Sequence, residues 1–219
     1  MKVFVVAMPK EANAIRENFE LHVTANLFGF EVTRGLIHKE ESAIVVSGVG
    51  KSNAAAATML AIAEFKPEAI INIGLAGGLD STLQPGFIVK VNKVVQSDFN
   101  LCGVDGVPIG TIDDRDSPFF RLNGPFTERP VVCATNDRFI SDMNDALILR
   151  RTFCADVCDM ELGAIAHVCS KAFVPLYSWK VISDMAAGSP PPIQYRQNME
   201  RGIWVIKENA AKLYQEVGA

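Results

Sequence analysis

The chain has 219 residues, of which 49% are hydrophobic and 21% are charged, and its formal net charge at pH 7 is −4. No low-complexity linker or internal repeat divides it, so we expect a single domain over residues 1–219 with a substantial hydrophobic core. The acidic balance gives no basic footprint for nucleic acid, and no apolar run reaches the length of a membrane span.

The first residues and the cysteines indicate a cytoplasmic protein. The apolar stretch 3–7 is too short for a secretory signal peptide, and Glu11 follows it too soon. An odd number of cysteines, mostly in predicted strands or helices, indicates reduced and buried thiols rather than a disulfide framework. Cys154, Cys158 and His167 do not predict a zinc site, because no CxxC motif occurs. We therefore expect no metal and no cofactor.

Strands alternate with helices along the chain. Buried-type strands are predicted at 2–7, 69–75, 87–95, 130–134, 155–158 and 174–182. A hairpin-like pair is predicted at 27–32 and 36–47, and charged residues at 38–41 interrupt its second strand, which then runs over 43–47. Helices are predicted at 11–19, 53–65, 141–151, 162–172 and 195–217. The last helix is amphipathic, with Arg196, Arg201, Lys207 and Lys212 on its solvated face. This order predicts a three-layer α/β/α domain around a twisted, mixed but mostly parallel sheet.

Residues 96–130 are the least regular part of the chain. They contain several glycines and prolines and no helical period. A long segment of this kind is usually functional or a partner contact. Its phenylalanines are a candidate interface, although the segment could equally fold over its own pocket: Phe99, Phe119, Phe120 and Phe126.

Acidic residues follow two of the predicted strands. Glu161 comes after strand 155–158, and Asp184 closes strand 174–182, with one helix between them. This order predicts a βαβ unit with parallel strands, which would bring both acids to the sheet edge where α/β proteins bind ligands. The alternative is that Asp159 or Glu161 caps the helix, since acids are favoured in a first turn.

Similar positions near the other strands carry Glu11 and several small residues. Glu11 lies just past the first strand, although it could simply be an acid favoured at a helix start. The stretch 48–52 looks like the end of a phosphate loop, but Val45 stands where a Walker motif needs glycine. The run 76–78 leaves room for a flat ligand, or else forms a tight turn.

The three acids Glu11, Glu161 and Asp184 suggest carboxylate chemistry. The chain has three histidines, and none follows a strand, so a Ser-His-Asp or Cys-His mechanism lacks a base. Without a metal, carboxylates can cleave glycosidic bonds: one protonates the leaving group and one activates water. A third can hold the sugar and stabilise its cationic transition state.

Several motifs occur together in one order along the chain: Ala7-Met8-Pro9-Lys10-Glu11, Gly48-Val49-Gly50-Lys51, the run 70–78, Asp159-Met160-Glu161 and Ile182-Ser183-Asp184. On these motifs the chain resembles the purine nucleoside phosphorylase superfamily and, within it, the 5'-methylthioadenosine/S-adenosylhomocysteine nucleosidases. The resemblance implies a nucleoside phosphorylase-like fold, a purine nucleoside as ligand, a place in methionine salvage and a homodimer.

The resemblance also implies roles for individual residues. Glu11 would activate the water, Asp184 would serve the purine N7 as acid or hydrogen-bond partner, and Glu161 would bind the ribose hydroxyls. A carboxylic acid that donates at neutral pH needs a raised pKa, which we expect for Asp184 or its ligand. The remaining substrate-binding residues would line the sugar and base or orient Asp184: Met160, Ala76, Gly77, Phe139, Ile140, Ser183 and Val49.

Water is the expected acceptor rather than phosphate. The related phosphorylases carry an arginine just before the position of Gly74, where this chain has Asn72-Ile73. Leu75 stands where many nucleosidases have Ser or Thr. The resemblance also implies that the segment beginning near Asp98 helps form the 5' pocket and the dimer contact, and this segment departs from the family between Val107 and Pro130. The 5' substituent therefore stays open among methylthioadenosine, S-adenosylhomocysteine, 5'-deoxyadenosine, aminodeoxyfutalosine and other purine nucleosides. Two alternatives stay open as well: a phosphorylase of the same fold and a non-catalytic purine nucleoside-binding protein.

Overall fold

A computed structural model describes residues 1–20, 22–113, 115–124, 130–186 and 191–218. Its helices are α1 (Pro9–Arg16), α2 (Lys51–Phe65), α3 (Cys102–Asp105), α4 (Met143–Phe153), α5 (Leu162–Ala172) and α6 (Pro191–Gln215). Its strands are β1 (Lys2–Val6), β2 (His22–Leu27), β3 (Phe30–Ile37), β4 (Glu40–Val46), β5 (Ala69–Gly78), β6 (Ile88–Gln96), β7 (Phe120–Arg121), β8 (Val131–Thr135), β9 (Val157–Asp159) and β10 (Leu176–Met185).

The strands form one mixed sheet in which part of the sheet closes on itself. β5 pairs with β1 and β10 in parallel and with β9 in antiparallel orientation. β10 pairs with β6, β6 with β8, and β8 with β9, so five strands form a closed ring. β1, β4, β3 and β2 extend the sheet away from this ring. β5 therefore joins the ring to the extension.

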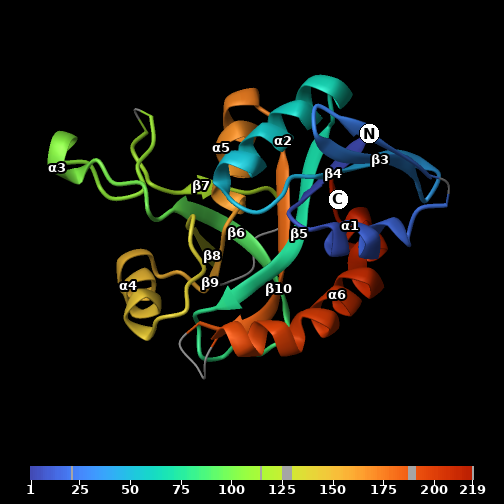
Figure 1. Cartoon of the computed structure of the whole chain (residues 1–219). Coiled ribbons are helices and arrows are strands. Elements are labelled where there is room, and N and C mark those ends of the chain that lie inside the picture. The colour runs from blue at the N-terminus through green and yellow to red at the C-terminus, as the bar shows by residue number, and fades with distance from the viewer. Residues whose placement is uncertain (21, 114, 125–129, 187–190, 219) are drawn as a thin grey trace.

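Helices cover both sides of the sheet, as the α/β fold class predicted (Figure 1). One apolar core includes small side chains of α2 and branched side chains of α5, such as Ala57 and Ile165. A second core includes Ile15 of α1 together with Ile206 and Tyr214 of α6. Because β5 contributes side chains to both cores, its sequence is apolar at nearly every position instead of alternating.

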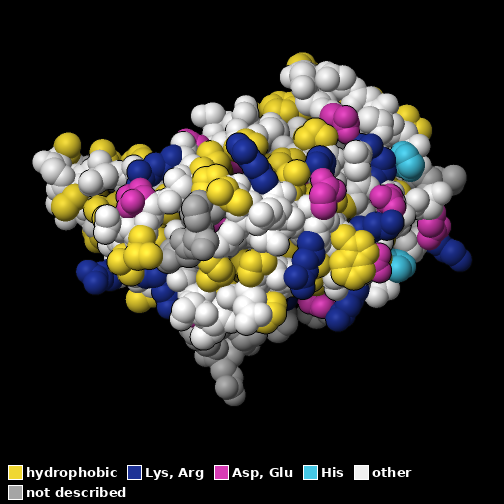
Figure 2. Space-filling model, turned by 60° about the horizontal axis from the view of Figure 1, so that its bottom comes forward, with side chains coloured by type: hydrophobic (Ala, Val, Ile, Leu, Met, Phe, Trp, Pro, Cys, Tyr) yellow, Lys and Arg dark blue, Asp and Glu magenta, His cyan; other side chains and the backbone are white. Residues whose placement is uncertain are grey.

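The surface of α6 is as its amphipathic pattern predicted. Its basic residues Arg196, Arg201, Lys207 and Lys212 are all exposed. Figure 2 shows the face at the bottom of Figure 1, where side chains of both charges are mixed with apolar ones. No helix in the described part of the chain is both long and apolar enough to cross a membrane.

The prediction of a parallel βαβ unit around α5 is wrong. β10 runs parallel to β5, whereas β9 runs antiparallel to it, so β9 and β10 point in opposite directions. β9 has only three residues, and it pairs with β5 only at the carboxyl end of β5, where Cys158 lies opposite Gly77. Glu161 and Asp184 still line the same pocket, because β9 pairs with β5 at Gly77 and Gly78, the end of β5 where Asp184 also lies.

The hairpin prediction is also wrong in its boundaries, because three strands stand where two were expected. The turns fall at 28–29 and 38–39, where Phe28, Gly29, His38 and Lys39 all have positive φ. Two-residue hairpin turns need such conformations, which the sequence normally signals with glycine or asparagine. The second turn has neither, so the sequence marked only an interruption at 38–41 and not a turn.

The irregular segment packs differently from the predicted apolar interface. Phe120 is buried against the His167 ring, and Phe119 makes an edge contact with the Phe153 ring. Phe99 packs on the core that includes Ala57 of α2 and Ile165 of α5. Phe126 lies outside the described residues. Among the described residues of this segment, the large apolar side chains that are exposed are those of Leu101 and Val104, around α3. Figure 1 shows α3 at the tip of an arm that extends from the body.

All five cysteines are free, as expected, but not all are buried. Cys133, Cys158 and Cys169 are buried, whereas Cys102 and Cys154 are exposed. Cys154 is the residue that ends α4 in a left-handed conformation, which places its side chain at the surface. The prediction of buried thiols is therefore wrong for these two positions.

Candidate active site

One pocket at the carboxyl ends of β5 and β10 brings together every residue predicted from the sequence. Those residues are Glu11, Val49, Ala76, Gly77, Phe139, Ile140, Met160, Glu161, Ser183 and Asp184. Seven further residues line the same pocket: Ala7, Met8, Leu75, Arg138, Cys158, Asp159 and Tyr195. β5 continues through Gly78, so the tight turn considered for 76–78 is wrong and these small residues form a pocket wall.

Glu11 is clamped between the start of α1 and the end of β5. Its Oε2 accepts hydrogen bonds from the backbone N–H groups of Ala7 (3.1 Å) and Met8 (3.0 Å), and its Oε1 accepts one from Leu75 (2.9 Å). A side chain at Gly74 would lie 3.0 Å from Oε1, so glycine there makes room for the carboxylate. Burial raises the pKa of Glu11, while the three N–H donors oppose that rise.

Asp184 owes its direction to an irregularity in β10. The pairing register with β5 shifts between Ile182 and Asp184, so Asp184 lies opposite Gly77. Side chains alternate along a strand, and one extra residue turns the next side chain to the other face. Asp184 thereby points away from the face that carries Ile182.

The Asp184 carboxyl is buried and only partly satisfied. Its Oδ1 lies 2.6 Å from the Ser183 hydroxyl, whereas Oδ2 has no hydrogen-bond partner in the described part of the chain. A Cβ at Gly77 would lie 3.3 Å from Oδ2, so a larger residue there would crowd it. Burial raises the pKa of Asp184, which confirms the direction expected from the sequence.

Glu161 stands at the cap position before α5 but does not cap it. Its side chain makes no hydrogen bond to the first turn; instead Oε1 accepts the backbone N–H of Gly50 at 3.0 Å. Burial and the nearby Asp159 charge raise the pKa of Glu161 to about 7. The helix-capping alternative is correct for Asp159, whose Oδ2 accepts the N–H of Leu162 at 2.9 Å.

Aromatic and apolar side chains form the outer wall. Phe139 and Ile140 lie between β8 and α4, with Phe139 partly exposed and Ile140 buried. The ring of Tyr195, from α6, meets the Phe139 ring edge-on at 5.7 Å, and its hydroxyl lies 3.4 Å from the Met8 sulfur. Sequence reasoning missed Tyr195, because it was expected only as the first residue of a surface helix.

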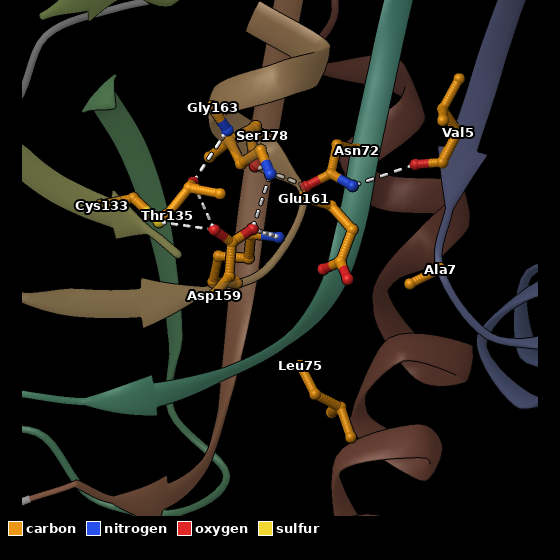
Figure 3. A network of polar contacts seen from close by, with 12 residues as sticks. Val5, Ala7, Asn72, Leu75, Cys133, Thr135, Asp159, Glu161, Gly163 and Ser178 are labelled. Carbon is orange, nitrogen blue, oxygen red and sulfur yellow. Dashed lines mark hydrogen bonds and ion pairs between the residues drawn. The ribbon is translucent and has the colours of Figure 1, made fainter. Parts of the chain in front are cut away.

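The sequence reasoning also missed a buried charge pair below the pocket. The Lys180 Nζ lies 2.7 Å from Asp159 Oδ2, and both side chains are almost fully buried. Asp159 Oδ1 accepts the Thr135 hydroxyl at 2.6 Å, and Figure 3 shows Glu161 beside this cluster. A lysine within the apolar strand 174–182 was the signal that could have revealed the pair.

The pocket holds little free positive charge. Arg138 is the one Lys or Arg among the described lining residues, and its guanidinium lies 2.7 Å from Asp145. No group of three or more His, Cys, Asp or Glu residues in the described ranges is arranged to hold a metal ion. The arrangement favours proton transfer by carboxyl groups over binding of an anion.

Comparisons with known proteins identify the family. A model of the Phosphorylase superfamily matches residues 2–215. The 5'-methylthioadenosine/S-adenosylhomocysteine nucleosidase of Bacillus cereus is 30% identical over 231 aligned residues, covering 99% of this chain and 100% of the relative. The chain belongs to the phosphorylase superfamily, in its 5'-methylthioadenosine/S-adenosylhomocysteine nucleosidase family. The resemblance stated from the motifs is thereby confirmed.

Solved structures of this nucleosidase family share the fold. A mutant of the Helicobacter pylori enzyme with 5'-methylthioadenosine in its active site has a TM-score of 0.91 at 23% identity, covering 99% of this chain and 98% of that one. The Neisseria meningitidis enzyme in complex with methylthio-immucillin-A gives 0.86 at 25% identity, covering 98% and 96%. Futalosine hydrolase of Helicobacter pylori gives 0.87 at 23% identity, covering 99% and 96%.

Proposed function

We propose that the protein hydrolyses the N-glycosidic bond of a purine nucleoside and releases the base, adenine, and a ribose derivative. The observation that carries this proposal is the convergence of three buried carboxylates, those of Glu11, Glu161 and Asp184, on one pocket. Family membership supports the same reaction, because the relatives are named as nucleosidases for 5'-methylthioadenosine and S-adenosylhomocysteine.

Two of the carboxyl groups move protons. The bond between the ribose C1' and the purine N9 breaks, and its electron pair stays with the base. Asp184 donates a proton to N7, a role that suits its raised pKa and its unpartnered Oδ2. Glu11 takes a proton from the water whose oxygen bonds to C1'. The three N–H groups that hold Glu11 fix the direction of its carboxylate, so little reorganisation is needed at that step.

The other residues bind and orient. Glu161 accepts hydrogen bonds from the ribose hydroxyls and stabilises the cationic sugar in the transition state. Ser183 holds Asp184 through the 2.6 Å contact with Oδ1. The sugar and the base lie against the remaining predicted residues: Met160, Val49, Ala76, Gly77, Phe139 and Ile140.

Water fits the pocket better than phosphate. A phosphate nucleophile needs charged donors that are free to bind it. Arg138 is already paired with Asp145, and Lys180 is paired with Asp159 below the pocket. The Glu11 carboxylate would also repel an anion at the position of the nucleophile.

The 5' group, the assembly and the location are the finer parts of the proposal. We expect a 5'-thio-substituted adenosine, a homodimer and a cytoplasmic enzyme of methionine salvage. The shared fold of futalosine hydrolase makes a larger 5' substituent the second candidate. Light scattering of the purified protein tests the dimer, and a mass equal to one chain would reject it.

The experiment is chromatography of base release from methylthioadenosine, S-adenosylhomocysteine, aminodeoxyfutalosine, adenosine and inosine, each with and without phosphate. We expect adenine without phosphate, and loss of release in Asp184→Asn. Glu208→Gln, a change of one exposed acid on α6, is the matched control and should release base like the parent. Release only with phosphate would make the protein a phosphorylase, and no release from any nucleoside would favour a binding role.

A further inference from the structure

We propose that the buried pair formed by Lys180 and Asp159 is a positioning device that sets the ionisation of Glu161. Lys180 favours the negatively charged form of Glu161 inside the pocket. Asp159 opposes this effect through its own negative charge, and it also holds the backbone next to Glu161. The inference rests on the proposed function, because it assigns a task to the charge of the ribose-binding residue.

Asp159 is fixed by four donors from four directions. Oδ2 accepts from Lys180 Nζ at 2.7 Å and from the Leu162 N–H at 2.9 Å. Oδ1 accepts from the Thr135 hydroxyl at 2.6 Å and from the Cys133 thiol at 3.4 Å. The bond to Leu162 ties Asp159 to the residue directly after Glu161, so the pair controls where Glu161 stands.

Thr135 is fixed in turn by the first turn of α5. Its hydroxyl oxygen accepts the N–H of Gly163 at 2.8 Å, as Figure 3 shows. A side chain at Gly163 would lie 3.0 Å from the Thr135 Cβ and 2.7 Å from Gln96, so only glycine allows this approach. The chain Gly163–Thr135–Asp159 therefore has little freedom to move.

Lys180 lies at the same level of the sheet as Glu11. Its partner on β5 is Gly74, and the Cβ direction of Gly74 points at the Glu11 carboxylate. Partners on neighbouring strands share a face, so Lys180 extends on the face that Glu11 approaches. Lys180 is the one buried Lys or Arg among the described residues, and its charge acts on both Glu11 and Glu161.

A pair of this kind is weak support for folding. Two buried charges lose their hydration, and apolar residues of similar volume often serve stability as well or better. The Lys180 side chain lies beside Asp159 and near Glu161, whereas its neighbours Trp179 and Val181 pack in the core on the opposite face of β10. Because such a pair contributes little to folding, its place beside Glu161 points to a task in the pocket.

Several charged or titratable groups face Glu161. Asp159 raises its pKa, as does Glu11 more weakly, while Lys180 and the Gly50 N–H lower it. The Tyr195 hydroxyl is near enough for Glu161 to raise the tyrosine pKa. Asp184 and Arg138 complete the charged lining, and Arg138 is occupied by Asp145. Among these groups, Lys180 and Asp159 act in opposite directions, so their removal has opposite effects.

The test is the pH profile of kcat/KM for base release, measured for the parent, Lys180→Met, Asp159→Asn and the double variant. The acid limb of this profile reports ionisation in the free enzyme. A neighbouring charge shifts a pKa by about one unit or more. We expect Lys180→Met to shift the acid limb to higher pH by about one pH unit. The kcat/KM value would then fall roughly tenfold near neutral pH and recover at alkaline pH. Asp159→Asn should move it downward.

Three comparisons keep the proposal falsifiable. Lys180→Arg retains the charge and should restore the parent limb, and the double variant, which leaves no unpaired charge, should fall between the single variants. Lys207→Met removes the lysine of an exposed pair with Glu17 (2.6 Å) and should leave the profile unchanged. Equal losses at every pH in both single variants, with the limb unmoved, would show that the pair is merely structural.

A second measurement separates this inference from the proposed function. Carbon-13 NMR can titrate the Glu161 carboxyl directly, with Glu161→Gln as the assignment control. Opposite shifts in Lys180→Met and Asp159→Asn would support the inference even if the parent released no base. Identical titration in the parent and both variants would overturn it, whatever the activity.

Discussion

Two aspartates, Asp159 and Asp184, are both buried, but their pKa values are shifted in opposite directions. Asp159, at the end of β9, accepts hydrogen bonds from Lys180, Leu162 and two further donors. Asp184, at the end of β10, accepts one from Ser183, and its Oδ2 has no partner among the described residues. Although burial alone would raise both pKa values, the Lys180 ammonium and the other donors hold the pKa of Asp159 below its usual range. The pKa of Asp184 stays raised.

The difference teaches that donors, and not depth, decide the charge of a buried carboxyl. Asp159 is a permanent carboxylate that organises the start of α5. Asp184 has an uncommitted oxygen, which is the state that a proton donor needs before substrate arrives. The same residue type thus performs a structural task on β9 and, in the function proposed above, a chemical task on β10.

The largest effect is expected when Asp184 is replaced by a residue that cannot donate a proton to the base. Asp184→Asn keeps the size and the contact with Ser183 but cannot act as an acid, and a general acid contributes about 10²–10⁴-fold to rate. We expect kcat for base release to fall by that range, while thermal unfolding changes little. A variant that retained more than about a tenth of parent kcat would contradict the assignment of Asp184.

The opposite experiment removes the satisfied carboxylate. Asp159→Ala leaves Lys180 buried without its partner, and breaking such a pair destabilises a protein by about 3–5 kcal/mol. Because the folded pKa of Asp159 is depressed, this contribution is present above about pH 4 and is lost as the pH falls further. Urea unfolding at neutral pH measures the loss.

A surface pair is the control for that prediction. Glu200→Ala removes an exposed carboxylate that lies 2.6 Å from Lys10, and exposed pairs contribute at most about 1 kcal/mol. If both alanine variants lost the same stability, burial of the Asp159 pair would have no special weight.

The Glu161 carboxyl is buried like those of the two aspartates, and its pKa is raised. We therefore expect Glu161→Gln to stabilise the protein. Its pKa of about 7 in the folded state exceeds the value near 4.3 of an unfolded chain, so its ionisation opposes folding at and above neutral pH. The variant should gain about 1–3 kcal/mol at pH 8, and the gain should vanish as the pH falls to about 4.5. Activity should be lost in the same variant.

Denaturant unfolding at both pH values measures this gain. A glutamine variant less stable than the parent at pH 8 would mean that the carboxylate is well satisfied in the free protein. Glu64→Gln, at an exposed ion pair with Arg34, is the control and should differ little from the parent at either pH.

The smallest effect is expected at the rim of the pocket. Tyr195→Phe keeps the edge contact with Phe139 and removes only the hydroxyl that lies 3.4 Å from the Met8 sulfur. The loss of such a weak bond should change stability by less than about 1 kcal/mol and KM by only a few-fold. A fall in kcat of more than tenfold would make the hydroxyl a participant in the reaction.

Many residues of the site could be predicted from the sequence, but the geometry that positions them could not. Acids and small residues that end apolar strands identified the pocket, because an apolar strand seldom ends in a buried acid without a reason. The register shift that aims Asp184 and the reversed direction of β9 depend on pairing between distant strands. Such pairing leaves no local pattern in the sequence.

The fold class followed from the alternation of strands and helices, whereas the closure of the ring did not. Closure requires β10 to pair with β5 on one side and β6 on the other, a choice that the apolar pattern of β10 leaves open. The charged residues 38–41 marked an interruption, but no turn was predicted at His38 and Lys39, because both residues adopt a conformation that usually needs glycine. Tyr195 was missed because an aromatic residue at a helix start has many ordinary explanations.

The place of β10 in the ring also bears on how the chain is synthesised. β10 is the last strand to leave the ribosome, yet it fills the gap between β5 and β6. Until then both strands expose an open edge, which is the feature that promotes association between chains. We expect nascent chains that end before Leu176 to need chaperone protection and to be cut readily by protease, while chains that extend through α6 resist. The strand that directs Asp184 into the pocket is thus also the one that closes the ring of the sheet.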